Sequence, residues 1–350
     1  MNKLFKKVFL SVISLLLAIT TLATSTYAWM SLNAEAWVEG MQFTATGGEG
    51  FLISVDGVRY KTQLTQLEIY QAIVCKYKEY KFVDSEVVDK DGNILTEDEI
   101  TNLVKEIKLE PITSINSKAG QLPLTNLLNQ DASKDSYLEF DIYFKRVDNS
   151  EAATEVKIYL NGEAENYSEN FLVPQTSITS VKEYVTLKTG LNCIIRDENE
   201  AELSKNRYYA GDKIAVHSSN ATRLGIISNV AEQVVELTNN YDLGSYATDS
   251  NEIKYYADMN AMFTYYNNLK NNSLQRLSYE NDLPKNYYTS LLDKNGENQV
   301  LMCSLKGNEA EKVTFKLWLE GWDADCFDGI GKSISVQLSF VQEKEYWYNR

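Results

Sequence analysis

Histidine is almost absent from this chain of 350 residues, which contains one, His217. A serine or cysteine nucleophile needs a base that a third group holds in place, and motifs such as HExxH need at least two imidazoles. His217 lies in the strand-like stretch KIAVHSS, where Ile214 and Val216 alternate with it. We therefore expect a structural or surface role for His217, and multi-histidine metal motifs are excluded.

Cysteine, proline and glycine are also scarce. The four cysteines, Cys75, Cys193, Cys303 and Cys326, form no CxxC pair, which disfavours a zinc site. An oxidising compartment would permit one or two disulfides, but the spacing does not imply them. Only four prolines and 17 glycines are present, which argues against a disordered or fibrous chain.

Basic residues are outnumbered, 34 against 49 acidic ones, so the formal charge is −15. An anionic surface repels phosphate-rich polymers, and nucleic acid is therefore not expected as a partner. Tyrosine, in contrast, is abundant, with 23 residues. Aromatic side chains suit half-buried pleated surfaces, which favours strands.

The first 30 residues have the layout of a secretory signal. In MNKLFKKVFLSVISLLLAITTLATSTYAWM, lysines precede an apolar run and small residues end it. This layout predicts a signal helix over residues 1–28 with cleavage between Ala28 and Trp29. Cleavage would remove three lysines and no acid, changing the formal charge from −15 to −18, and would leave 29–350 as one domain. The alternative is a retained anchor, because residues 8–30 could just span a bilayer. In both cases the body leaves the cytoplasm, and a cleaved protein touches a membrane only through this segment before cleavage.

A strand with one apolar face is predicted directly after the cleavage position. Apolar and polar residues alternate there with a period of two, and the apolar positions are Met30, Leu32, Ala34, Ala36 and Val38. A strand at a chain terminus has no hairpin partner before it. It can therefore pair with its own sheet or with the exposed edge of another subunit, which makes it a candidate self-association strand.

The rest of the chain reads as strands with helical insertions. Period-2 alternation predicts strands in YLEFDIYFKRV, TEVKIYLNG, KVTFKLWLEGW and KSISVQLSFVQ, shorter strands in CIIRD, KIAVHSS, RLGIIS, EQVVELT and VLMCSLKG, and a hairpin in FLISVDGVRY around Asp56-Gly57. Helical spacing and a Thr96–Glu99 capping box predict helices within residues 65–107, and NEIKYYADMNAMFTYYNNLKN predicts another near 251–270. The pattern indicates a mainly β protein, an antiparallel β-sandwich with helical insertions.

Acidic residues suggest two kinds of site that the sequence supports only weakly. DKDGNILTEDEI places Asp89, Asp91 and Asn93 at the first ligand positions of a calcium loop, but Ile94 replaces the glycine of the turn and Ile100 the bidentate glutamate. A tight turn followed by a capped helix explains the same residues. Pairs of carboxylates could hydrolyse a glycosidic bond, yet almost any acidic chain contains such pairs.

Residues 318–330, WLEGWDADCFDGI, concentrate tryptophans, carboxylates and a cysteine. The residues of this late strand-loop motif are Trp318, Glu320, Gly321, Trp322, Asp323, Asp325 and Cys326. Alternation predicts that Leu317 and Leu319 face the core and that Trp318 faces the other side, while Gly321 ends the strand and the aspartates follow in a polar loop. Cys326 could be buried or paired. We expect a structural turn, with a divalent-cation site as the alternative, because the stretch offers a catalyst no base and no cationic partner.

Two of these segments resemble a known family. The export segment ending TSTYAWMSLN and the late VTFKLWLEGWDADCFDGIGKSISVQLSF look like the exported Firmicutes proteins grouped with TasA and camelysin, whose signal peptides are cut by the peptidase SipW. YLEFDIYFKR and IAVHSSNATRLGII fit the same pattern. The resemblance covers residues 1–40 and roughly the last 50 residues. It implies a jelly-roll sandwich at the cell surface, where TasA-like proteins form matrix fibres by lending an N-terminal strand to the next subunit. The protease-like activity of camelysin is not implied, because no metalloprotease motif is present.

These features predict a secreted or cell-surface structural protein, not an enzyme and without a cofactor. It would be a self-assembling subunit of a biofilm matrix or fibre that uses its N-terminal strand. Its partners would be itself or related surface proteins, with a cell-wall or matrix polysaccharide as a further candidate. The alternative is a glycan-binding adhesin whose aromatic side chains stack on sugars, and an acid-pair hydrolase is the third reading.

Overall fold

The computed structural model describes residues 36–37, 42–47, 50–114, 122–128, 130–147, 155–162, 165–168, 171–173, 175–196, 203–230, 232–236, 265–269, 288–290, 299–323, 326–327, 330–331 and 334–342. The chain divides into two compact units, Met1–Ala34 and Glu35–Arg350, and all described residues belong to the second. The predicted signal helix, the cleavage position, Met30, Leu32, Ala34, Val38 and Asp325 lie outside the described residues. Within the described ranges, no helix is long and apolar enough to cross a membrane.

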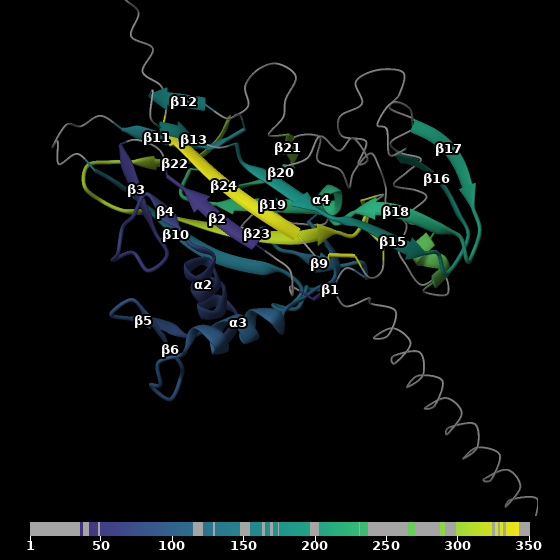
Figure 1. Ribbon diagram of the computed structural model, residues 1–350, viewed down its shortest axis with the longest axis horizontal. Coiled ribbons are helices and arrows are strands. Elements are labelled where there is room, and N and C mark those ends of the chain that lie inside the picture. The colour runs from purple at the N-terminus through teal and green to yellow at the C-terminus, as the bar shows by residue number, and fades with distance from the viewer. Residues whose placement is uncertain are drawn as a thin grey trace, which may run out of the picture. The chain divides into compact units, whose positions relative to one another are not determined.

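The protein is mainly β, and most of its described strands belong to two large sheets (Figure 1). The first sheet has the order β21 (Tyr288–Ser290), β20 (Glu232–Glu236), β19 (Thr222–Ile227), β23 (Glu311–Glu320), β10 (Leu138–Arg146) and β3 (Phe51–Ser54), with β8 (Pro111–Thr113) paired to β23 and β9 (Thr125–Asn126) paired to β8. The second has the order β22 (Gln299–Leu305), β11 (Val156–Asn161), β24 (Ile334–Gln342), β2 (Gln42–Thr46) and β4 (Gln63–Leu64), with β14 (Ser177–Ser180) also paired to β24.

Most neighbouring strands are antiparallel, as predicted, but the sheets are mixed. Three pairs are parallel: β2 with β24, β20 with β21, and β23 with β8. Each joins segments that lie far apart in the sequence, so no hairpin turn imposes antiparallel pairing on them. The prediction of purely antiparallel sheets is therefore wrong at these three positions.

Phenylalanine side chains from both large sheets meet in one apolar core. Phe140 of β10 stacks on Phe315 of β23, with ring centroids 5.4 Å apart. Phe340 of β24 lies 6.0 Å from Phe315 and 5.0 Å from Phe144 of β10. All four side chains are buried, and each such ring pair adds about 0.5–1.5 kcal/mol beyond area burial. The period-2 alternation predicted for β10, β23 and β24 is confirmed.

The helices predicted within residues 65–107 are confirmed. They are α2 (Gln66–Lys78) and α3 (Glu97–Lys105). Each begins at a capping box, formed by Thr65 and Glu68 in α2 and by Thr96 and Glu99 in α3, which satisfies amide groups that the first turn leaves without a helical partner. A further single turn, α4 (Ser218–Ala221), follows β18. Residues 265–269 are helical, and the rest of the helix predicted near 251–270 lies outside the described chain.

Five two-stranded sheets complete the described strands. They are β1 (Ala36–Trp37) with β7 (Lys108–Leu109), β5 (Lys81–Val83) with β6 (Glu86–Val88), β12 (Glu165–Ser168) with β13 (Phe171–Val173), β15 (Lys182–Thr186) with β18 (Lys213–His217), and β16 (Leu191–Arg196) with β17 (Leu203–Tyr208). Backbone bonds from Leu187 to Asp212 and from Gly211 to Leu187, both 2.8 Å, join the β15–β18 and β16–β17 pairs into one long ribbon.

The hairpin predicted around Asp56-Gly57 forms only in part. Ile53 and Lys61 exchange two backbone hydrogen bonds of 2.8 and 2.9 Å, but residues 55–60 are not a strand. The amides of Val58 and Arg59 instead donate to the Asp56 carboxylate, each at 2.8 Å. An aspartate that binds nearby backbone amides competes with strand pairing, and here the local turn prevails.

Candidate functional site

The late strand-loop motif ends β23 and lies inside the protein. Its described side chains, Trp318, Glu320, Trp322, Asp323 and Cys326, are each at most 1% exposed. Asp323 follows the strand, as predicted, but it is buried and not a solvated loop residue. Leu317 and Leu319 face the core, as predicted, and Trp318 faces the other way, but that second face is covered as well.

A separate segment covers this second face. Lys316 of β23 donates from Nζ to the carbonyl of Leu122 at 3.2 Å, and the Leu122 amide donates to Glu232 at 2.9 Å. A Cβ at Gly225 of β19 would lie 2.9 Å from Leu122 Cδ1 and 3.1 Å from Trp318 Cζ3. The tight approach of these three residues explains why a side chain that leaves the core face is still buried.

Arg223 of β19 supplies the cation of the site. It stands opposite Glu236 of β20 and opposite Trp318 of β23, so all three side chains share the covered face. Its Nη2 lies 2.6 Å from Asp323 Oδ2 and 3.8 Å from Glu236 Oε1, and its Nη1 donates to the carbonyl of Asn220 at 2.7 Å. The motif thus has a cationic partner, contrary to the sequence prediction, but the partner comes from a strand 100 residues earlier.

Glu320 is the second acid of the motif. Its Oε2 accepts from Trp318 Nε1 at 3.2 Å and from the Ser114 amide at 3.4 Å. Burial raises the pKa of Glu320 above its usual range, and the hydrogen bond from Thr113, the charge of Arg223 and the other two donors offset burial only in part. Burial therefore favours the neutral acid. We name Arg223, Glu236, Glu320 and Asp323 the buried charge cluster.

Gly321 allows the covering segment to lie close to the motif. A Cβ at this position would be 2.5 Å from Leu127 Cδ2 and 3.3 Å from the carbonyl carbon of Pro111. The Gly321 amide donates to the carbonyl of Ile112 at 2.7 Å, and the Asp323 amide donates to that of Glu320 at 2.9 Å. The predicted turn after the strand is therefore confirmed, and a larger residue has no space there.

The chemistry open to the buried charge cluster follows from its burial. A carboxyl with a raised pKa that acts together with a second carboxylate is an arrangement that glycosidases use. Here, however, Glu320 and Asp323 are both fully buried, which keeps a sugar away from them. Among the described residues, no group of three or more histidine, cysteine, aspartate or glutamate side chains is arranged to hold a metal. The arrangement best suits joining β19, β20, β23 and the turn after β23.

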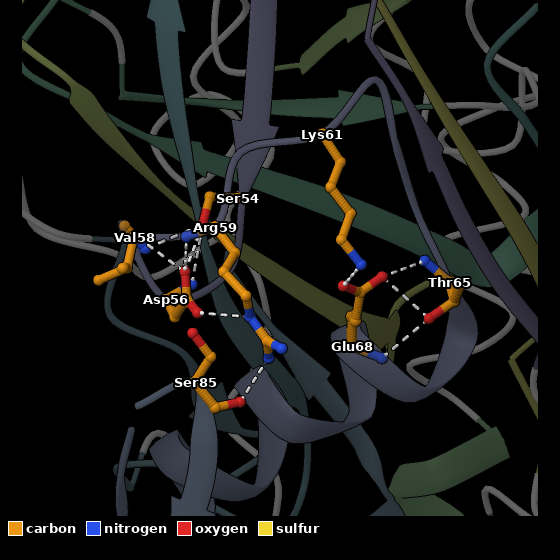
Figure 2. A network of polar contacts seen from close by, with 9 residues as sticks. Ser54, Asp56, Val58, Arg59, Lys61, Thr65, Glu68 and Ser85 are labelled. Carbon is orange, nitrogen blue, oxygen red and sulfur yellow. Dashed lines mark hydrogen bonds and ion pairs between the residues drawn. The ribbon is translucent and has the colours of Figure 1, made fainter. Parts of the chain in front are cut away.

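A second polar cluster surrounds Asp56 in the partial hairpin (Figure 2). Ser54 Oγ donates to its carboxylate at 2.6 Å, and Arg59 Nε lies 3.6 Å away. Burial alone would raise the pKa of Asp56. The hydrogen bonds from Ser54, Ser85 and the amides of Val58 and Arg59 outweigh burial and hold that pKa well below its usual range. All but Ser85 of these donors are close in sequence, so this is a locally built turn.

The remaining candidate residues are engaged in packing. His217 Nδ1 lies 3.3 Å from the carbonyl oxygen of Ser180, which fits a structural role. The next residue, Ser218, donates to Glu183 and accepts from the Gly331 amide at 2.7 Å. The Ser218 hydroxyl is thus occupied by a carboxylate and an amide.

Three cysteines, Cys75, Cys303 and Cys326, are free thiols. Burial raises the pKa of Cys75 and of Cys303 to about 12. A thiol with such a pKa stays protonated near neutral pH and is a poor nucleophile or metal ligand.

A pocket of about 270 Å³ lies beside α2. Ile73 and Ile107 are among its apolar residues, and lysines and glutamates stand at its rim. Lys76 lies 3.4 Å from Glu139, and Lys134 lies 2.8 Å from Glu79. Since each of these lysines faces a carboxylate, the rim has little net charge with which to select an ionic ligand.

Comparison with known proteins identifies no relative of this chain. No protein-family model, no curated protein and no solved structure matches it. The likeness to TasA and camelysin is therefore carried only by the segments quoted from the sequence.

Proposed function

We propose that this chain is an exported structural protein of the cell surface or extracellular matrix that acts without catalysis. In this proposal its two large sheets form a jelly-roll-like β-sandwich. The N-terminal segment directs export, and the strand over residues 30–38 associates with another subunit. The likeness to TasA-like proteins supports export and assembly.

The attachment of β1 is the observation that carries the proposal. Among the described residues, Ala36 pairs with Leu109 and Trp37 with Lys108 between β1 and β7. The two strands form a sheet of their own, outside the two large sheets. A strand near the chain start that pairs outside the two large sheets can exchange its intramolecular partner for an equivalent edge on another subunit without breaking either large sheet.

The late strand-loop motif supports the absence of catalysis. Its carboxylates are buried, and Asp323 is paired with Arg223. Burial of this kind is what an interior packing element needs, whereas a reaction centre needs a path for its substrate. The motif therefore favours a structural role.

Electron microscopy of the full chain, expressed in a secreting host, tests the proposal. Replacing Leu32 and Val38 with lysine puts charge on the predicted apolar face, so filaments should disappear and folded monomer should remain. The matched control replaces Ser31 and Asn33, on the opposite face, with lysine and should keep the filaments. Sequencing of the exported protein should begin at Trp29.

Three results would contradict the proposal. One is a chain that remains inside the secreting host. Another is equal filament formation by the two lysine variants. The third is a Leu32→Lys, Val38→Lys variant that no longer folds, because the strand would then belong to its own sheet.

A glycan-binding surface protein is the second candidate, and one observation favours it. Tyr184 is 70% and Tyr209 is 60% exposed, and exposed aromatic rings can stack on sugars. Binding to insoluble cell-wall polysaccharide should then fall about tenfold or more in a Tyr184→Ala, Tyr209→Ala variant, since two stacking contacts would be lost. Unchanged binding would remove this candidate.

A further inference from the structure

One face of the β15–β18 pair is basic and exposed. Lys182, Tyr184 and Thr186 of β15 are exposed, whereas Val185 between them is buried. In the antiparallel register Lys182 stands opposite His217 and Thr186 opposite Lys213, which is exposed too. We name Lys182, Tyr184, Lys213 and His217 the basic face. It is a local exception in a chain of formal charge −15.

The acid of β15 lies on the other side of this pair. Glu183 accepts a hydrogen bond from Ser218 and one of 3.0 Å from the Gly331 amide, so it is turned to the interior. Exposed Val181 and Tyr209 flank the basic face, and the nearby Lys188 is exposed. Asp212, which precedes Lys213 in the sequence, accepts from the Tyr209 amide at 2.7 Å. The face thus combines positive charge with exposed apolar and aromatic surface.

A second patch has the opposite charge and a similar apolar content. Of the 16 residues from 84 to 99, seven are acidic and one is a lysine. The exposed acids of this stretch are Asp84, Glu86, Asp91, Glu97, Asp98 and Glu99. They follow β5 and β6 up to the first turn of α3, and Val83 and Ile94 beside them are 51% and 64% exposed. We name residues 83–99 the acidic end.

The two patches are drawn apart within one molecule. Figure 1 draws β5 and β6 at one end of the Glu35–Arg350 unit and β15 and β18 at the other. They match in charge and in exposed apolar side chains, and complementary charge steers association and fixes its register. We propose that the basic face binds the acidic end of a second copy of this chain.

Such a contact is head-to-tail, since two different surfaces meet. A head-to-tail contact that does not close into a ring produces an open row of subunits. Each exposed ion pair contributes at most about 1 kcal/mol and is screened by salt, so the contact is weak and depends on ionic strength. This inference rests on the proposed structural function but uses surfaces separate from the N-terminal strand, and a matrix could use both contacts.

A charge-swap experiment on the full chain tests the inference by sedimentation velocity. The basic-face variant is Lys182→Glu with Lys213→Glu, and the acidic-end variant is Asp91→Lys with Asp98→Lys. Each alone should weaken association about tenfold or more at about 50 mM salt, because the exchanged positions then bring like charges together. Mixing the two should restore association, because each retains one original surface and the altered surfaces are again complementary.

The matched control is Lys306→Glu with Lys312→Glu, which changes the formal charge equally at exposed positions on another part of the protein. This control should associate as the original chain does. About 500 mM salt should dissociate the original chain, since screening then acts within a few ångströms. The charge swaps are repeated in a chain that also carries Leu32→Lys and Val38→Lys. Assembly through the N-terminal strand is blocked there, so any change in association reports on the charge contact alone.

Several results would overturn the inference. A basic-face variant that associates like the original chain removes the basic face. If each variant associates weakly and mixing the two variants does not restore association, the acidic end is not the partner of the basic face. If the Leu32→Lys, Val38→Lys variant with both charged patches intact is monomeric at low salt, only the N-terminal strand mediates assembly, and the proposed function still stands. If that variant still forms filaments, the proposed function is contradicted and the charge contact remains.

Discussion

Two arginine–aspartate pairs among the described residues have different surroundings. Arg223 and Asp323 lie 2.6 Å apart, their side chains at most 1% exposed. Arg59 and Asp56 lie 3.6 Å apart, and the Arg59 side chain is half exposed. The first pair joins segments 100 residues apart, whereas the second closes a turn between residues three apart.

The difference shows how burial changes the effect of one ion pair. Arg59 in water loses little hydration and gains little from its partner, as is usual at a surface. Arg223 and Asp323 have lost their hydration, so each depends on the other and on the carbonyl groups that Arg223 contacts. A buried pair of this kind adds little net stability but makes the loss of one partner costly.

Removing the buried cation should give the largest effect. Arg223→Met leaves the Asp323 carboxylate buried without its counter-ion, and the free energy of unfolding should fall by about 3–5 kcal/mol. Arg59→Met, the matched change at the half-exposed arginine, should cost at most about 1 kcal/mol. Denaturant unfolding of both variants measures the comparison. Equal losses would show that burial does not separate the two pairs.

Filling the space at Gly321 should have the next largest effect. A methyl group there would overlap Leu127 Cδ2, which lies 2.5 Å from the position of the added carbon, so Gly321→Ala should cost about 1–3 kcal/mol. Leu127→Ala removes that atom. The double variant should therefore lose less stability than the two single losses added together, since the residues are in contact. Strict additivity would show that the covering segment does not lie against the turn.

Local signals in the sequence predicted much of the fold. The Thr96 capping box and the alternation through Phe140, Phe315 and Phe340 fall in elements that the structure contains. The hairpin predicted at Asp56 forms only in part, because the Asp56 carboxylate accepts hydrogen bonds from amides that strand pairing would otherwise use.

The buried charge cluster could not be predicted in the same way. Its cation belongs to β19 and its acids to β20, β23 and the following turn, and only the strand order brings them together. Asp323 looks like a loop residue because nothing in WLEGWDADCFDGI indicates that Arg223 of β19 pairs with it in the interior. A signal was present in RLGIIS, since an arginine inside an apolar strand needs an anionic partner.

The ionisation of Glu320, in the same buried charge cluster as Arg223 and Asp323, should make stability depend on pH. Its pKa is raised in the folded state, so above its unfolded pKa of about 4.3 the unfolded chain loses a proton first and stability falls with rising pH. Glu320→Gln removes this dependence. Relative to the original chain, the variant should become more stable as the pH rises above about 4, because burial disfavours the ionised form of the group that it replaces. A difference independent of pH, measured by denaturant unfolding, would contradict the neutral form of Glu320.

The smallest effect is expected at the Arg59–Asp56 pair, and its pH dependence has the opposite sign. The pKa of Asp56 is lowered in the folded state by Ser54, Ser85 and the amides of Val58 and Arg59 against the effect of burial. The carboxylate therefore stabilises the protein above its unfolded pKa of about 3.9, and this stability is lost as the pH falls below that value. Asp56→Asn keeps an acceptor for the turn but removes the charge, so it should cost about 1 kcal/mol at neutral pH and less in acid. Urea unfolding over the same pH series as for Glu320→Gln measures both, with Asp91→Asn, an exposed acid, as the control. If the two variants changed stability with pH in the same direction, burial and local hydrogen bonding would not have opposite effects on these two acids.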